Sequence, residues 1–294
     1  MTSIKDLLSP MDETGSEEKV QEEDTVKPVN MALETTRYVL ELILDPICPN
    51  CYIGLKSLNT AIETYKARHP EAVFEVTCSP FMLHPSAARS AYDKASYIPR
   101  TAHSFDEWNT LGEAVGIHFS WRGRTGSTRD AHKLLRFALE SEPTSARSTH
   151  FARPQPHPQP QSPAAQPLPS PQSQHDRPPP QRGPALQMRL LSALLRAYHE
   201  SDADLSDRTF LASTAAAATG LPRREIERVL GSERWGAAVD GLCAEVRRGR
   251  SVAIEAVPTL IVNDRYVIGG WQRAGFLVDE FERVGLGVGG AWDG

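Results

Sequence analysis

Two kinds of hydrophobic pattern alternate at the start of the chain. Residues 37–45 (RYVLELILD) alternate apolar and polar positions and are rich in β-forming residues, which predicts a strand. Residues 52–69 place most of their apolar side chains on one helical face, which predicts an amphipathic helix. A second strand is expected over 73–83, interrupted by Pro80. The pattern therefore predicts a β-α-β unit.

The middle of the chain has helical periodicity. Ser104 and Glu107 form a candidate capping box for a helix that Gly116 would end, and Thr128 is a candidate cap for the next helix. Pro222 is expected at the first position of a later helix. The helices are predicted over residues 104–116, 129–141, 186–201, 206–220, 221–231 and 232–249.

The pattern changes again near the end of the chain. Two short strands, 259–264 and 265–270, flank an Asn-Asp turn, and a last helix is expected over 272–284. The order is strand, helix, strand, several helices, strand, strand and helix. This order predicts an α/β fold in which a helical insert separates a β-α-β unit from a ββα unit.

Three segments fall outside this pattern. Residues 1–35 are polar and acidic and predict a disordered tail, and 286–294 form a short C-terminal tail. Residues 143–184 hold 13 of the 23 prolines, which predicts an extended segment without helix or sheet. Three explanations of that segment remain open: a disordered insertion, a proline-rich ligand for a partner domain, and an artefact of the gene model.

Composition narrows the classes of function. The chain has 294 residues, 40% of them hydrophobic, and a net charge of −5, so a broad nucleic-acid footprint is not expected. No stretch approaches the roughly 18 consecutive apolar residues of a membrane span, so no membrane partner is expected. The N-terminus lacks the basic start and apolar run of a secretory signal, which favours a cytoplasmic location.

The strongest chemical signal is Cys48-Pro49-Asn50-Cys51, between a predicted strand and a predicted helix. A helix N-terminus carries partial positive charge and stabilises a thiolate, so Cys48 is the expected nucleophile and Cys51 the expected resolving thiol. Structural zinc normally needs four ligands, and the sequence has no second such pair, so no metal is expected. A pair of inert buried cysteines is the remaining alternative.

Four other residues accompany this motif. Val257 and Pro258 open a late strand, and beside a thiol pair that position favours a cis bond, although a trans proline at a strand edge is the ordinary case. Asp45 either relays protons to Cys51 or caps the loop. His132 is either a packed core residue or a direct participant. The remaining cysteines, 78 and 243, are expected to be inert core residues.

The stretches DPICPNCYIG (45–54) and VPTLIVNDRYVIGGWQ (257–272) together resemble DsbA-like thioredoxin-fold oxidoreductases, more closely the FrnE-type branch. That superfamily also includes kappa-class glutathione transferases and hydroxychromene carboxylate isomerases. The resemblance covers about 36–141 and 185–283. It implies a thioredoxin-like fold whose halves, 36–100 and 245–285, flank a helical insertion over 101–244.

The resemblance also implies roles for particular residues. Cys48 and Cys51 would be the redox pair, faced by a cis Pro258 preceded by Val257. Two positions depart from the family pattern. Asn50 stands where the family often has Trp, and Ser127 replaces the Asn of an Asn-Thr-x-x-Ala-His motif whose histidine corresponds to His132.

The expected activity is thiol-disulfide exchange with a disulfide- or thiol-containing protein or a small thiol. No tightly bound cofactor is expected, although glutathione is a candidate redox partner. The alternatives are a glutathione-dependent transferase or isomerase acting on a small molecule, and a non-catalytic protein acting through the proline-rich segment. The transferase and isomerase branches characteristically have Ser in place of the first cysteine, so the presence of both Cys48 and Cys51 favours disulfide chemistry.

Overall fold

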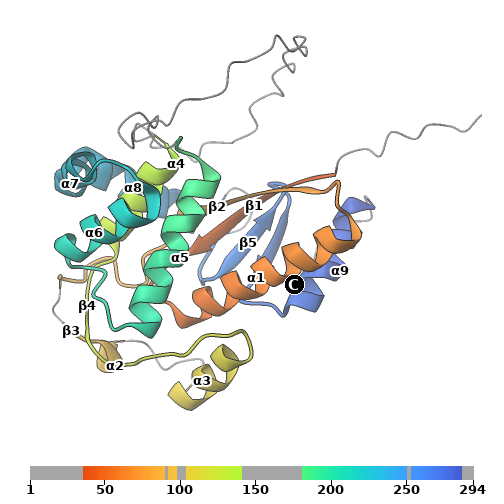
Figure 1. Ribbon diagram of the computed structural model, residues 1–294, viewed down its shortest axis with the longest axis horizontal. Helices are drawn as coiled ribbons and strands as arrows, with labels where there is room; N and C mark the ends of the chain where they lie inside the picture. Colours follow the sequence, from red (N-terminus) through yellow and green to blue (C-terminus); the bar gives the residue numbers. More distant parts are fainter. Residues whose placement is uncertain (1–35, 90–91, 98–103, 141–180, 250–252, 287–294) are drawn as a thin grey trace, which may run out of the picture. The chain divides into compact units, whose positions relative to one another are not determined.

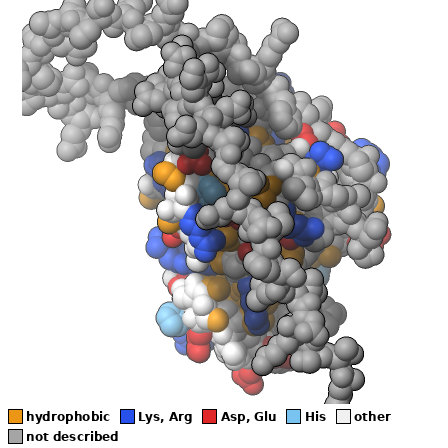
Figure 2. Space-filling model, turned by 90° about the vertical axis from the view of Figure 1, so that its right-hand side faces the viewer, with side chains coloured by type: hydrophobic (Ala, Val, Ile, Leu, Met, Phe, Trp, Pro, Cys, Tyr) orange, Lys and Arg blue, Asp and Glu red, His pale blue; other side chains and the backbone are white. Residues whose placement is uncertain are grey.

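The computed structural model describes residues 36–89, 92–97, 104–140, 181–249 and 253–286, which are coloured in Figure 1. The predicted acidic tail (1–35), most of the proline-rich segment and nearly all of the predicted C-terminal tail lie outside these residues. No helix in the described ranges is long and apolar enough to cross a membrane. On the face in Figure 2, basic and acidic side chains are interspersed.

A four-stranded sheet forms the base of the fold. Its order is β2-β1-β5-β6, with β1 parallel to β2 and antiparallel to β5, and β5 antiparallel to β6. This topology confirms the predicted β-α-β and ββα units. The strands are β1 (Arg37–Leu44), β2 (Val73–Pro80), β5 (Thr259–Val262) and β6 (Tyr266–Gly269).

Two helices belong directly to this sheet. Helix α1 (Pro49–Arg68) connects β1 to β2, and α9 (Ala274–Gly285) follows β6. The two helices pack against each other, in orange and blue in Figure 1. The turn between β5 and β6 has Asn263 and Asp264 at φ 51° and 55°. These left-handed conformations suit the predicted Asn-Asp turn, because both residue types tolerate them.

The helical insert lies between β2 and β5 in sequence. Its helices α4, α5 and α8 contact β2 (Figure 1). A two-stranded sheet of β3 and β4 and the short helix α2 were not predicted, because each has only two to four residues and no periodicity. The insert comprises β3 (Tyr92–Asp93), α2 (Lys94–Tyr97), α3 (Phe105–Glu113), β4 (Arg124–Thr125), α4 (Arg129–Leu139), α5 (Pro184–Glu200), α6 (Arg208–Thr219), α7 (Arg223–Gly231) and α8 (Glu233–Arg248).

Several predicted boundaries shift. The second strand ends at Pro80 rather than at residue 83, because Pro80 pairs with Leu44, the last residue of β1. Pro222 precedes α7 instead of opening it. Thr128 does not cap α4, because its backbone is already helical (φ −89°, ψ 0°). Helix α8 lies within the helix predicted over 232–249, since it begins after Ser232 and ends at Arg248 before Gly249, which has a φ of 64°. The capping box of Ser104 and Glu107 is confirmed at the start of α3.

One side chain docks the insert onto the edge of the sheet. Gln187 of α5 is 1% exposed. Its side-chain amide both accepts a hydrogen bond from and donates one to the backbone of Cys78, on the edge strand β2. Its Oε1 accepts from the Cys78 N–H at 2.8 Å, and its Nε2 donates to the Cys78 carbonyl at 2.9 Å. The amide therefore takes the place of a neighbouring strand at this point. Without it, the backbone groups of this edge would be free to pair with another chain.

Replacing Gln187 with Leu should lower the free energy of unfolding by about 2–4 kcal/mol, because two buried backbone groups lose their partners. Chemical denaturation measures the change. Ser192→Ala, on the exposed face of the same helix, is the control and should change stability by less than about 0.5 kcal/mol. A Gln187→Leu variant as stable as the wild type would show that the amide does not dock α5.

Candidate active site

The end of β1 leads through a four-residue turn into α1, and this junction carries the cysteine pair. The Cys48 N–H donates to the Asp45 carbonyl at 3.0 Å and closes the turn. Cys48 is the N-cap residue with extended backbone (φ −82°, ψ 118°), and its carbonyl accepts from the Cys51 and Tyr52 N–H groups at 3.1 and 3.3 Å. Pro49 occupies the first turn of α1, where its missing N–H has no helical acceptor to lose.

The two cysteines differ in exposure. Both are free thiols, and Cys48 is 6% exposed whereas Cys51 is 0% exposed. Burial raises the pKa of the Cys51 thiol well above its ordinary value, and the hydrogen bond and charge interaction with Cys48 raise it further. Cys51 therefore retains its proton, and Cys48 is the sulfur of the pair with some access to solvent.

The segment at Val257 and Pro258 faces this junction. The Val257–Pro258 bond is cis, the isomer expected from the sequence. The Cys48 thiol donates to the Val257 carbonyl at an Sγ to O distance of 3.8 Å, across 209 residues of sequence. Helix α1 approaches the Val257–Pro258 segment closely because Gly54 has no side chain. A Cβ at Gly54 would lie 3.1 Å from Pro258 Cγ and 3.4 Å from Trp271 Cβ.

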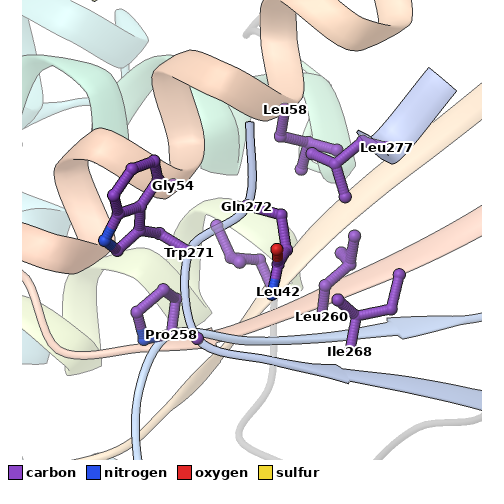
Figure 3. Close-up of a pocket in the computed structure, with 10 residues that line it drawn as sticks. Leu42, Gly54, Leu58, Pro258, Leu260, Ile268, Trp271, Gln272 and Leu277 are labelled. Atoms are coloured by element: carbon purple, nitrogen blue, oxygen red, sulfur yellow. The ribbon is translucent and has the colours of Figure 1, made fainter. Parts of the chain in front are cut away.

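A small apolar pocket lies on the other side of Pro258 (Figure 3). Leu42 and Leu260 of the sheet, Leu58 of α1 and Leu277 of α9 line it. Trp271 stands at its rim beside Gly54, while the Gln272 side chain turns back to donate to the Gly269 carbonyl at 3.0 Å. The pocket therefore places an apolar surface next to the segment that faces Cys48.

Asp45 is completely buried behind the junction. Its carboxylate accepts from the Leu83 N–H at 2.8 Å and from the Ile47 N–H at 3.5 Å, and it bonds the Thr128 side chain. Burial raises the Asp45 pKa to about 7, although these hydrogen bonds and the charge of Arg247 oppose the change. Thr128 thus contacts Asp45 rather than capping its own helix.

His132 lies beside Asp45. It is 3% exposed, and its Nε2 is 3.8 Å from Asp45 Oδ1 without a hydrogen-bond partner. Burial lowers the His132 pKa to about 4, and a hydrogen bond with the Phe81 backbone opposes this shift. The imidazole is therefore neutral near pH 7. Asp45 also lies near enough to Cys51 for its charge to raise the Cys51 pKa.

Sequence reasoning missed several residues that hold the junction in place. Asn50 Oδ1 accepts from Trp108 Nε1 at 3.0 Å, and the Pro46 carbonyl is bonded by His199 Nε2 at 3.0 Å. The Tyr52 hydroxyl donates to Glu200 Oε1 at 2.5 Å. These contacts join positions 58 to 153 residues apart, so no local pattern signals them.

The other two cysteines lie in packed surroundings. Cys78 is on β2 and Cys243 on α8, and burial raises the pKa of each thiol to about 12. Ser127 accepts a hydrogen bond from the Arg129 N–H at 3.4 Å. Within the described ranges, no group of three or more His, Cys, Asp or Glu side chains is arranged to hold a metal ion.

Comparison with known proteins supports the fold. Residues 39–154 match the family described as the DSBA-like thioredoxin domain. A probable DsbA oxidoreductase from Streptomyces coelicolor aligns with a TM-score of 0.59 at 20% identity, covering 87% of this chain and 93% of that one. A candidate protein disulfide isomerase from Nitrosomonas europaea aligns with a TM-score of 0.52 at 15% identity, covering 86% of this chain and 100% of that one.

No curated protein matches the chain in sequence. The structural similarities, at 20% identity and below, concern the fold. The family match includes the junction that carries Cys48 and Cys51. The chain therefore matches the DSBA-like thioredoxin domain over residues 39–154 and has the DsbA-like thioredoxin fold.

Proposed function

We propose that this protein is a thiol-disulfide oxidoreductase that exchanges disulfides through Cys48 and Cys51. The observation that carries the proposal is the pair of free thiols at the start of α1, with Cys48 facing the Val257 carbonyl. Cys48 stands at the N-terminus of α1, which is the positive end of the helix dipole. The DSBA-like match over this region agrees with that chemistry.

The exchange takes place in two steps. The Cys48 thiolate attacks one sulfur of a substrate disulfide, the substrate S–S bond breaks, and the departing thiolate takes up a proton. Cys51 then loses its proton and attacks the Cys48 sulfur, which releases the second substrate thiol and leaves a Cys48–Cys51 disulfide. Two electrons pass from the protein to the substrate, and the reverse sequence oxidises a dithiol substrate.

Val257 and Pro258 contribute the surface along which a substrate lies. The Val257 carbonyl already accepts a hydrogen bond from the Cys48 thiol, so a polypeptide bound to Cys48 passes beside this backbone. An apolar side chain of that polypeptide would contact the apolar surface beyond Pro258 (Figure 3). These features favour a disulfide- or thiol-containing protein as substrate.

Asp45 supplies the base for the second step. Cys51 is fully buried and holds its proton strongly, so its attack needs an acceptor inside the protein. A carboxyl group with a pKa near 7 can exchange that proton close to neutral pH. His132 remains neutral, and its unpartnered Nε2 lies 3.8 Å from Asp45 Oδ1, so it adds no positive charge beside the carboxyl group.

We further propose glutathione as the redox partner, acting in the cytoplasm, with no tightly bound cofactor. A small thiol of this kind regenerates either redox form by the same two steps. A glutathione-dependent transferase or isomerase would not require Cys51. Whether activity depends on Cys51 therefore distinguishes disulfide exchange from a transferase or isomerase activity.

Cys51→Ser should accumulate a mixed disulfide on Cys48 after incubation with oxidised glutathione, because the second step is lost. Cys48→Ser should form no adduct at residue 51, since that position is buried. Mass spectrometry of the intact protein and of its peptides measures the adducts. Cys243→Ser serves as the control and should exchange as the wild type does, and an adduct that first forms on Cys51 would reverse the assigned roles.

Asp45→Asn should slow closure of the Cys48–Cys51 disulfide by at least about ten-fold near pH 7.5, because the amide cannot accept the Cys51 proton. In the wild type, closure should accelerate from pH 6 to pH 8 as the carboxyl group, with its pKa raised to about 7, becomes ionised. Rapid mixing with 4,4′-dithiodipyridine resolves the two steps, because each releases one chromophore.

The first chromophore release is the internal control, since attack by Cys48 does not use Asp45 as a base. It should change less than the second release in the Asp45→Asn variant. A wild-type closure rate that is flat between pH 6 and pH 8, or an unchanged rate in the variant, would exclude Asp45 as the base.

A further inference from the structure

The side chain between the two cysteines has a defined polar orientation. Asn50 is the second residue of α1, and its Oδ1 accepts a hydrogen bond from Trp108 Nε1 at 3.0 Å. An indole N–H is only a donor, so it selects the oxygen end of the amide. The Asn50 NH₂ group is consequently left on the other side of the amide.

That NH₂ group is an available donor. Asn50 is half-buried, unlike the fully buried Cys51 that follows it. Within the ranges that the structure describes, the NH₂ group has no hydrogen-bond partner. A donor of this kind beside Cys48 can bond an acceptor on a substrate that has approached the sulfur.

Trp108 is a rigid partner for the amide. It is 2% exposed and belongs to α3, whose first turn is fixed by the capping box of Ser104 and Glu107. Its indole packs against Trp121 at a ring-centroid distance of 5.5 Å, and Trp121 stacks on Phe105 at 4.4 Å. Because the aromatic cluster holds the indole in place, the Asn50 amide has little freedom to rotate.

We propose that Trp108 is a positioning residue that presents the Asn50 NH₂ group to a backbone carbonyl beside the substrate cysteine. The favoured substrates are then cysteinyl peptides, in contrast to disulfides that carry no carbonyl near sulfur. The inference rests on the proposed disulfide exchange at Cys48. It adds a determinant of specificity supplied by the helical insert.

Two disulfides distinguish this role from a general effect on the thiol. N,N′-diacetylcystine diamide carries uncharged carbonyl groups near its sulfurs, whereas bis(2-hydroxyethyl) disulfide carries none. Single-turnover rate constants of the reduced protein with each compound give a selectivity ratio. Any change in Cys48 reactivity affects both rates and cancels in that ratio.

Asn50→Leu and Trp108→Phe should each lower the ratio by about three- to ten-fold, the contribution of one hydrogen bond. The matched control is Asn109→Leu, which removes the acceptor of an equivalent bond from Trp121 Nε1 (2.9 Å) and leaves every ring of the cluster in place. That control should leave the ratio unchanged. Circular dichroism and the thermal midpoint establish that each variant is folded.

Three outcomes would overturn the proposal. In the first, both variants lower the two rates equally, so that the ratio is unchanged. In the second, Asn109→Leu alters the ratio as much as Asn50→Leu does. In the third, only Asn50→Leu alters the ratio, which would exclude Trp108 as the positioning residue. A wild-type protein that reacts with neither disulfide would instead contradict the proposed function itself.

Discussion

The site depends on the direct passage from β1 into α1. A parallel strand pair requires a connection back across the sheet, and here α1 supplies it. The turn closed by the Cys48 N–H and the Asp45 carbonyl leaves Cys48 at the N-terminus of that helix and Cys51 inside its first turn. Cys48 thereby keeps slight exposure while Cys51 is fully buried, and the proposed two-step exchange uses this difference.

The remaining parts of the molecule hold that junction from separate directions. The strand pair β5 and β6 brings the Val257 carbonyl to Cys48, and Gly54 allows α1 to approach the same segment closely. The insert contributes Trp108 to Asn50, His199 to Pro46 and Glu200 to Tyr52. The insert is in turn attached to the sheet by Gln187 of α5. The helical insert is therefore part of the site's construction as well as a covering of the sheet edge.

The sequence predicts the order of the main elements, because strand and helix periodicities are local properties of the chain. It also predicts a helix N-terminus at the cysteine motif and the turn at Asn263 and Asp264, where residue type limits the backbone. It could not predict the contacts of Trp108 or Gln187. Their partners lie 58 and 109 residues away, and a single polar contact leaves no repeat in the sequence. The sequence predicts a capping side chain at Thr128, but its side chain bonds Asp45, which lies far away in the sequence and gives no local signal.

The central claim is that Cys48 and Cys51 interconvert as one dithiol-disulfide couple. The most direct measurement equilibrates the protein in glutathione buffers of graded redox ratio and counts labelled thiols by mass after acid quenching and unfolding. The account predicts that two thiols, those of Cys48 and Cys51, disappear together in a single reversible two-electron transition. Cys78 and Cys243 should remain reduced. Loss of one thiol at a time, or retention of all four thiols throughout the series, would contradict it.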